Sequence, residues 1–246
     1  MGFRINTNVP SIAAQNSLSK TNRSAESTLS KMSSGSRITK AADDAAGLAI
    51  SEKLEATVRS NQQANRNAND GISMVQTAEG GLDEISNMLT RLRELSIQAA
   101  SDTVGDTERS FTDMEYQNLK QEIERISQVT EFNGTKLLAG QGDKLDFQIG
   151  VNNDEFQDRI SYDVANTNAS IDSLGISDIT VSNKDGAQTA LATIDKAIET
   201  VSGQRAGLGA IQNRLISTSN NLQITNENLS AANSRIRDVD YAQVSA

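Results

Sequence analysis

The chain has 246 residues, contains no histidine, cysteine or tryptophan, and carries a formal net charge of −9. Without imidazole or thiol groups, it cannot form the usual serine or cysteine triads, the common zinc sites or a disulfide. The acidic balance argues against nucleic-acid binding, which needs clustered Lys and Arg, and no segment is long and apolar enough for membrane insertion. We expect no enzyme activity, no catalytic residue, no metal and no cofactor.

The first predicted helix ends at the small residues 33–36, which are typical of a helix stop. Residues spaced by four and three form its inner stripe: Leu18, Asn22, Ala25, Leu29 and Met32. A second helix is predicted from Asp43 and Asp44, whose carboxylates suit a helix N-terminus, to about Ser101. Gly71 and Gly80-Gly81 lie inside it, and we attribute them to tight packing rather than to a bend.

A third helix is predicted after residues 104–107, and it ends before the turn at Asn133-Gly134. Apolar residues then alternate with polar or small ones over 145–151 and 160–164, which predicts a β-hairpin. Residues 165–186 are rich in Asn, Ser, Asp and Gly, so we expect an irregular connection there.

The clearest repeat is a heptad near the C-terminal end. Its seven members are Ile194, Val201, Leu208, Leu215, Leu222, Leu229 and Ile236. A helix over about residues 187–240 is far longer than most globular helices and needs partner helices along its length. We interpret the first half of the heptad as an intramolecular core, and beyond Leu222 the apolar pattern thins. The fold class is therefore mainly α, an elongated antiparallel helical bundle or coiled coil with a small β-hairpin insert.

Six segments together resemble bacterial flagellins, in the order that the family has them. They are RINTNVPSIAAQNSL, MSSGSRITKAADDAAGLAISEKL, NDGISMVQTAEGGLDEI, LTRLRELSIQAA, TEFNGTKLL and SRIRDVDYA. The resemblance implies an inner coiled-coil domain built from both chain ends and a surrounding helical domain. The corresponding boundaries are 1–42 for the N-terminal part of the inner domain, 43–186 for the helical core with its hairpin and connection, 187–220 for the C-terminal core helix and 221–246 for the C-terminal part of the inner domain.

The resemblance also implies a function, which is polymerisation into a flagellar filament for swimming. Repeating contacts that do not close generate a helical filament, and the burial of apolar seams drives it. The expected interface residues are Leu18, Leu29, Met32, Leu222, Leu229 and Ile236. The implied partners are other copies of the chain, the hook-junction and cap proteins, the export apparatus and its chaperone. The implied location is an extracellular filament reached through flagellar export, with a sheathed or periplasmic filament left open.

The segment LTRLRELSIQ is similar to the part of flagellins that an animal toll-like receptor recognises. By this resemblance the receptor epitope comprises Leu89, Arg91, Leu95 and Glu115. The alternative interpretation is a solvated helix face with ordinary surface ion pairs. The carboxylate pairs Asp43-Asp44 and Asp238/Asp240 are interpreted as helix caps or solvated groups rather than as an acid–base site.

Two other kinds of protein remain as alternatives to a filament subunit. One is the hook-filament junction protein, a flagellin relative, and the other is a coiled-coil adhesin or enzyme. Flagellins continue beyond SRIRDVDYA with further apolar helix, where their export chaperone is expected to bind. We therefore expect this chain to represent a truncated form whose inner coiled coil lacks part of its C-terminal strand.

Overall fold

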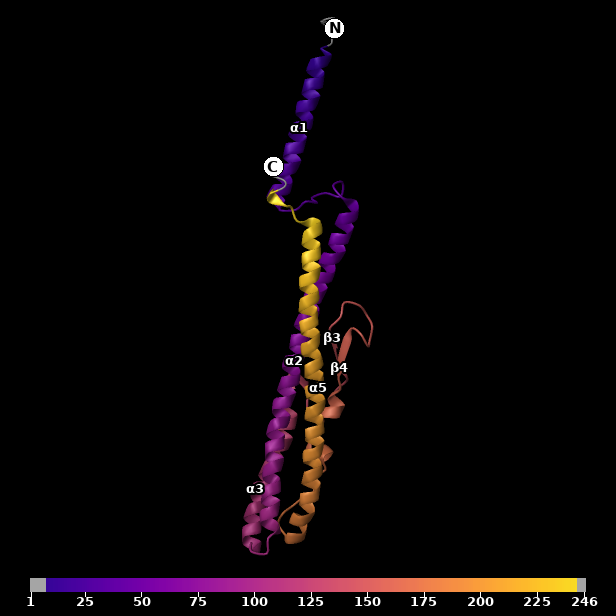
Figure 1. Cartoon of the computed structure of the whole chain (residues 1–246). Helices are drawn as coiled ribbons and strands as arrows, with labels where there is room; N and C mark the ends of the chain where they lie inside the picture. The colour runs from indigo at the N-terminus through magenta and orange to yellow at the C-terminus, as the bar shows by residue number, and fades with distance from the viewer. Residues whose placement is uncertain (1–7, 243–246) are drawn as a thin grey trace. The chain divides into compact units, whose positions relative to one another are not determined.

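The computed structural model describes residues 8–242, and residues 1–7 and 243–246 of the expected terminal domains lie outside the described residues. Helices dominate, which confirms the mainly α fold with a small β insert (Figure 1). The four long helices are α1 (Val9–Ser34), α2 (Ala45–Ala100), α3 (Asp106–Val129) and α5 (Lys184–Arg237). The shorter elements are β1 (Glu131–Phe132), β2 (Thr135–Lys136), β3 (Leu145–Gln148), β4 (Arg159–Tyr162), the 3₁₀ helix η1 (Val164–Thr167) and α4 (Ile171–Leu174).

The chain divides into two compact units. The terminal unit comprises Met1–Ser60 with Ile224–Ala246, and the central unit comprises Asn61–Gln223. On the N-terminal side this division falls later than the boundary expected between residues 42 and 43. On the C-terminal side it falls close to the boundary expected between 220 and 221.

In the central unit, α2 and α5 lie side by side and run in opposite directions (Figure 1). Three polar contacts fix their register: Arg93 to Asp195 at 2.7 Å, Arg205 to Asp83 at 2.9 Å and Ser219 to Asn65 at 2.6 Å. Between them lies one apolar core, which includes Leu82, Leu89 and Leu92 of α2 and four heptad residues of α5. Burial of this apolar surface is the main stabilising contribution to the central unit.

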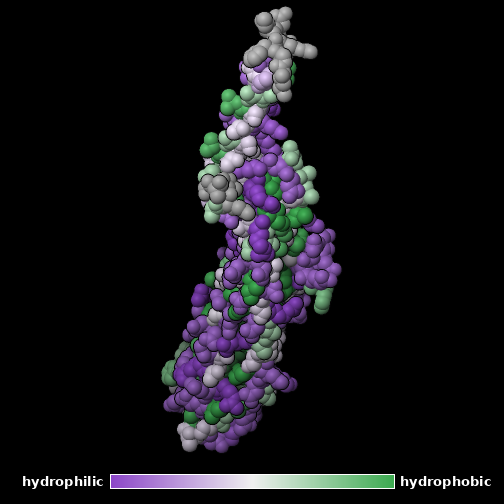
Figure 2. Space-filling model, turned by 45° about the horizontal axis from the view of Figure 1, so that its top comes forward, coloured by the Kyte–Doolittle hydropathy of each residue, from purple (hydrophilic) through white to green (hydrophobic). Residues whose placement is uncertain are grey.

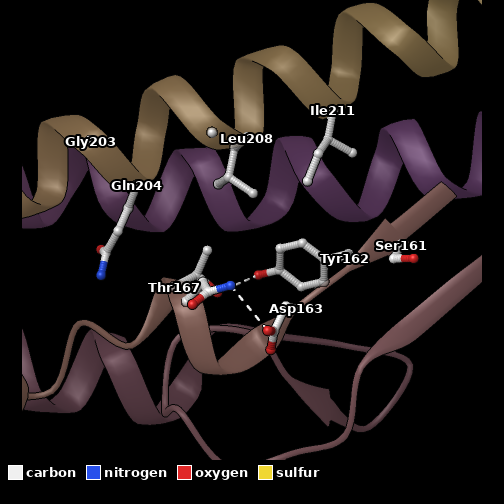
Figure 3. A pocket seen from close by; sticks show the side chains of 10 residues that line it. Ser161, Tyr162, Asp163, Thr167, Gly203, Gln204, Leu208 and Ile211 are labelled. Atoms are coloured by element: carbon white, nitrogen blue, oxygen red, sulfur yellow. Dashed lines mark hydrogen bonds between the residues drawn. The ribbon is translucent and has the colours of Figure 1, made fainter.

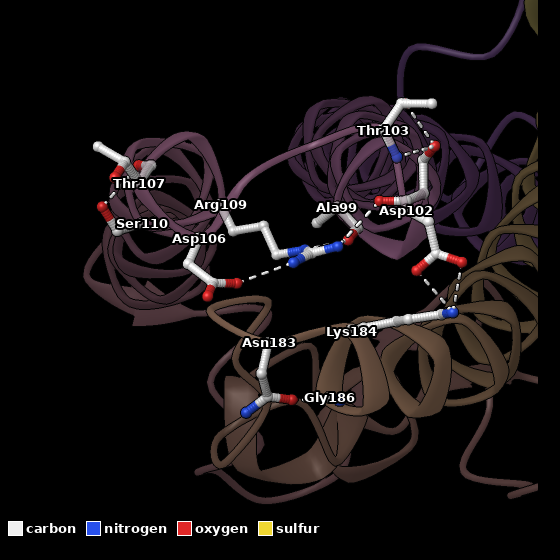
Figure 4. A network of polar contacts seen from close by, with 11 residues as sticks. Ala99, Asp102, Thr103, Asp106, Thr107, Arg109, Ser110, Asn183, Lys184 and Gly186 are labelled. Carbon is white, nitrogen blue, oxygen red and sulfur yellow. Dashed lines mark hydrogen bonds and ion pairs between the residues drawn. The ribbon is translucent and has the colours of Figure 1, made fainter.

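The turn between α2 and α3 is held by the buried side chain of Arg109 (Figure 4). Its guanidinium donates to the carbonyls of Ala99 and Ser101 and to the carboxylate of Asp106, each at 2.9 Å. The donor to Ala99 satisfies a carbonyl group in the last turn of α2, where the helix offers it no amide partner. Lys184, in the first turn of α5, forms an ion pair with Asp102 at 2.7 Å in the same region.

The glycines inside α2 differ in their surroundings. A Cβ atom on Gly71 would lie 3.0 Å from the Phe147 ring, and one on Gly81 would lie 2.8 Å from side-chain atoms of Leu138 and Thr130. No atom outside the local helix lies within 4 Å of such a Cβ on Gly80. The prediction of tight packing is confirmed at Gly71 and Gly81 and is wrong at Gly80, where the helix faces open space.

Two antiparallel hairpins follow α3. In the first, β1 and β2 are joined by Asn133 and Gly134, whose φ angles of 50° and 79° confirm the predicted turn. In the second, β3 pairs with β4, so that Leu145 lies opposite Tyr162 and Phe147 opposite Ile160. This confirms the hairpin predicted from the alternation of apolar and polar residues.

The connection to α5 contains two short helical turns and is tied to α3 by side chains. Lys120 donates to the carbonyls of Ser177 at 2.7 Å and Ile179 at 3.0 Å. Asp113 accepts from the amide of Val181 at 2.8 Å. Burial lowers the pKa of Lys120, but the ammonium group retains these two carbonyl partners. The irregular connection is therefore held in place by specific polar contacts.

Candidate assembly site

The helix α1 leaves its apolar side chains uncovered. Asn8 caps its first turn by accepting from the amide of Ser11 at 3.2 Å, and no residue of the helix is buried. Leu18 and Leu29 are 63% and 64% exposed, and Val9 and Ile12 are also exposed. Hydrophobic side chains lie among hydrophilic ones near the N-terminal end of the described chain (Figure 2). Leu18 and Leu29 share one face of α1, and such uncovered apolar residues need a partner surface to become buried.

After α1, the chain contacts the last residues of α5 and the segment that follows it. We call this contact, formed by residues 35–37 and 236–239, the terminal clasp. Gly35 takes a left-handed φ of 68°, and its carbonyl accepts from the amide of Val239 at 3.0 Å. The amide of Arg37 donates to the carbonyl of Arg237 at 2.6 Å, and Ser36 forms an antiparallel bridge with Asp238. The clasp joins two segments that are about 200 residues apart in the sequence by main-chain hydrogen bonds.

Side chains extend the terminal clasp on both sides. The Arg37 guanidinium donates twice to the carbonyl of Ile236, at 2.8 and 3.2 Å. The hydroxyl of Tyr241 donates to the carbonyl of Met32 at 2.8 Å. Arg237 forms an ion pair with Glu55 of α2 at 2.7 Å. The last turns of α1 and α5 are therefore fixed to each other and to the start of α2.

The carboxylates Asp43 and Asp44 organise the start of α2, as predicted. Asp44 accepts from the amide of Gly47 at 2.8 Å, which is a helix cap. Asp43 accepts from the amides of Thr39 and Lys40, each at 3.1 Å. These backbone hydrogen bonds, first from Thr39 and then from Lys40, lower the pKa of Asp43 to about 2.

The heptad of α5 separates into two parts. Ile194, Val201, Leu208 and Leu215 are buried in the core of the central unit, which confirms the intramolecular interpretation of the first half. Leu222, Leu229 and Ile236 are only half-buried, and so is Met32 at the end of α1. Ile224 is 61% exposed and was missed by the heptad, because it lies outside that series. An intermolecular role for the second half stays a prediction.

The four residues of the expected receptor epitope differ in accessibility. Leu89 and Leu95 are buried in the core, whereas Arg91 and Glu115 are exposed. Arg91 donates to Glu115 across α2 and α3 at 2.9 Å and to Glu94 at 2.9 Å. The hydrogen bonds with Glu94 and Glu115 raise the pKa of Arg91. The side chains of Arg91 and Glu115 are accessible to a partner. Those of Leu89 and Leu95 are packed in the core.

Neither a metal centre nor a membrane segment emerges within residues 8–242. No group of three or more carboxylate side chains there is placed to hold a metal ion. No helix within this range has the length and apolar character needed to cross a bilayer. The described features define a helical structural protein in which residues 35–37 are bound to residues 236–239 and the terminal helices carry uncovered apolar residues.

Comparisons with known proteins identify the family. The model of the bacterial flagellin N-terminal helical region matches residues 5–143, and that of the bacterial flagellin C-terminal helical region matches residues 191–246. The chain is 42% identical to flagellin of Halalkalibacterium halodurans, covering 97% of this chain and 87% of that protein. It is also 42% identical to flagellin of Bacillus subtilis, with 98% and 89% covered. The chain belongs to the bacterial flagellin family and is a structural subunit of the flagellar filament.

Solved structures agree with this assignment. The crystal structure of Bacillus cereus flagellin matches with a TM-score of 0.56 and 31% identity, covering 64% of this chain and 88% of that one. A putative flagellar hook-associated protein from Vibrio parahaemolyticus matches with a TM-score of 0.64 over 80% of this chain and all of that one, but at 15% identity. The second likeness shows the fold alone, so the identity to flagellins favours the filament subunit over the junction protein.

Proposed function

We propose that the chain polymerises through the apolar residues of its terminal helices and has no catalytic activity. The observation that supports this most directly is α1, which has no buried residue although it carries Leu18 and Leu29. Covering one such leucine contributes about 1.5 to 3 kcal/mol, and every subunit repeats the contact. Met32, Leu222, Leu229 and Ile236 complete the proposed interface, since their half-buried side chains keep apolar surface available.

This proposal is tested by placing a charge on the interface. Leu29→Asp and Leu222→Asp should each abolish sedimentable filaments, because an unpaired carboxylate in a buried seam is strongly unfavourable. The exposed Ser24 provides the matched control, because Ser24→Asp adds the same charge on the opposite side of α1. Sedimentation reports assembly and circular dichroism reports helicity. Normal filaments from both leucine variants would remove these positions from the interface.

The other partners follow from the family rather than from a contact in this chain. We propose that the subunit leaves the cell through the flagellar export apparatus with a chaperone and joins an extracellular filament. In that filament it would meet the hook-junction and cap proteins. Secretion is measured by detecting the intact subunit in medium from cells with and without a working export apparatus. Release of equal amounts from both strains would contradict export by this route.

We further propose that the subunit is recognised by the flagellin-sensing toll-like receptor of animals. The supporting observation is the exposed pair of Arg91 and Glu115, which joins α2 to α3 at 2.9 Å. Arg91→Ala should weaken receptor activation in a reporter-cell titration without loss of helicity. Arg93→Ala is the matched control, because Arg93 is also exposed on α2 but pairs with Asp195 of α5. Equal potencies of the Arg91 variant and the parent would remove Arg91 from the epitope.

A further inference from the structure

Asn133 and Gly134 form the only Asn-Gly pair in the chain. In such a pair the main-chain nitrogen of the glycine can attack the side-chain carboxamide of the asparagine, because glycine has no Cβ to obstruct the approach. The product is a cyclic imide, and the intramolecular attack is far faster than hydrolysis of the carboxamide by free water. The surroundings of the two residues decide whether a folded chain permits this reaction.

Neither reacting group is restrained by a hydrogen bond. Within residues 8–242 the carboxamide of Asn133 and the amide of Gly134 have no hydrogen-bond partner. Both residues are exposed, and a Cβ built on Gly134 would find no atom within 4 Å. The attacking nitrogen and the carboxamide are therefore open to solvent and to each other.

The imide closes only when the main chain of Asn133 rotates, and little structure opposes that rotation. The hairpin that carries the turn has two residue pairs, Glu131 with Lys136 and Phe132 with Thr135. A ladder this short is marginally stable on its own and opens at a low free-energy cost. The left-handed φ of 50° at Asn133 is itself a conformation that residues other than glycine adopt at an energetic cost. The turn can thus leave its native geometry without global unfolding.

The residues that follow the hairpin are firmly held, which confines the opening to the turn. Leu137 and Leu138 are fully buried. The carbonyl of Leu137 accepts from the hydroxyl of Tyr162 at 3.1 Å and from that of Thr167 at 3.0 Å. Figure 3 shows Tyr162 and Thr167 beside each other in the wall of a hollow next to α5. The core of the central unit therefore stays in place while the turn reacts.

We propose that Asn133 is a site of spontaneous deamidation in the folded subunit. The nitrogen of Gly134 loses its proton to hydroxide and forms a bond to Cγ of Asn133, and the side-chain amide leaves as ammonia after taking a proton from water. Water then adds to either carbonyl of the imide and breaks one C–N bond, which gives aspartate or isoaspartate. Water is consumed, ammonia is released and the site gains one negative charge. This modification goes beyond the proposed polymerisation and does not depend on it.

The two products have different effects on the hairpin. Aspartate keeps the length of the main chain and tolerates the left-handed backbone of the turn. Isoaspartate directs the main chain through the former side chain and adds one carbon, so Phe132 and Thr135 lose their register. The amide of Leu137, which donates to the carbonyl of Thr130 at 3.0 Å, should then exchange faster with solvent. Because no enzyme is required, the converted fraction would record the age of the polypeptide.

Incubation of the full chain in mildly alkaline buffer, followed by proteolysis and mass spectrometry, tests the proposal. We expect conversion at residue 133, with isoaspartate detected by an isoaspartyl methyltransferase and a labelled methyl donor. Asn133→Gln should lower the rate at this position by about tenfold or more, since the longer side chain must close a larger ring. The exposed Asn118 is the internal control, because Leu119 follows it and the amide of Leu119 lies within the ladder of α3.

The same reaction in chain unfolded with guanidinium chloride provides the reference rate. The folded subunit should react at Asn133 within about tenfold of that rate and keep its helical circular dichroism, because only the short hairpin has to open. A folded chain that stays intact while the unfolded chain reacts would overturn the proposal, because the hairpin would then protect the site. Aspartate without isoaspartate would exclude the imide and so overturn it too. Equal conversion of Asn118 and Asn133 would contradict the selectivity that the turn confers. None of these outcomes requires filaments.

Discussion

The central unit and the terminal unit use different kinds of contact. In the central unit, heptad residues such as Leu208 and Leu215 are about 1% exposed or less, and an apolar core holds the helices. In the terminal unit, Leu229 and Ile236 of the same series stay half-buried, and the helix ends are held by main-chain and charged hydrogen bonds of the terminal clasp. The same heptad repeat therefore supplies a buried core in one unit and half-buried side chains in the other. The number of neighbouring elements decides whether a heptad residue belongs to a core.

The difference in packing between the two units is tested most directly by replacing one leucine in each unit with alanine. Leu208→Ala should lower the free energy of unfolding by about 2 to 5 kcal/mol, since it removes a fully packed side chain. Leu229→Ala makes the same chemical change three heptads further along α5 and should cost less than about 1 kcal/mol in the monomer. Urea denaturation of monomeric protein measures both. Equal losses would show that the terminal unit has a core of its own.

The adjacent residues Gly80 and Gly81 test how packing affects stability at two neighbouring positions of α2. Gly81→Ala should destabilise the protein by about 1 to 3 kcal/mol, because the new methyl group would meet Leu138 and Thr130 at 2.8 Å. Gly80→Ala should instead stabilise it by about 0.5 to 1 kcal/mol, because alanine favours helix and nothing obstructs the methyl group. Thermal unfolding of the two variants gives shifts of opposite sign. Shifts of the same sign would contradict the packing described around Gly81.

A third change addresses the polar contacts of the terminal unit. Arg37→Ala removes both donors to the carbonyl of Ile236, so the amides of Arg37 and Val239 should exchange with solvent about tenfold faster. Amides of α2 within residues 61–100 should keep their exchange rates. Hydrogen exchange followed by mass spectrometry or NMR resolves the two groups. An equal increase of the amide exchange rates in both units would show that the terminal clasp also stabilises the central unit.

The smallest effect is expected from lowering the pH. The pKa of Asp43 in the folded protein is about 2, below its ordinary value of 3.8. Because the folded pKa is the lower one, the contacts of Asp43 stabilise the protein above about pH 4 and are lost as the pH falls toward 2. NMR titration of the carboxyl group should give the low pKa, and the amides of Thr39 and Lys40 should lose protection in that interval. In Asp43→Asn this pH dependence should disappear. A carboxyl that titrates near 3.8 would exclude these hydrogen bonds.

The sequence predicted the features that depend on local chemistry or on repetition. The Asn133-Gly134 turn, the hairpin after Leu145 and the long helices follow from backbone preferences and from periodicity. Gly80 and Gly81 could not be distinguished, since their surroundings differ only through the tertiary positions of Leu138 and Thr130. The terminal clasp was not predictable either. It is made by main-chain groups, and these carry no periodic signal that links residue 35 to residue 239.

That separation along the chain also bears on how the protein folds. Closing the clasp brings Ser36 within bridging distance of Asp238, which encloses about 200 residues in one loop. The entropy cost of loop closure grows with loop length, so this contact forms late unless other structure first shortens the path. Pairing of α2 with α5 provides that shortening, because their antiparallel register brings Glu55 to Arg237 at 2.7 Å. We therefore expect the terminal clasp to form only after α2 and α5 have paired. Until then the C-terminal end of α1 makes no contact with residues 236–239.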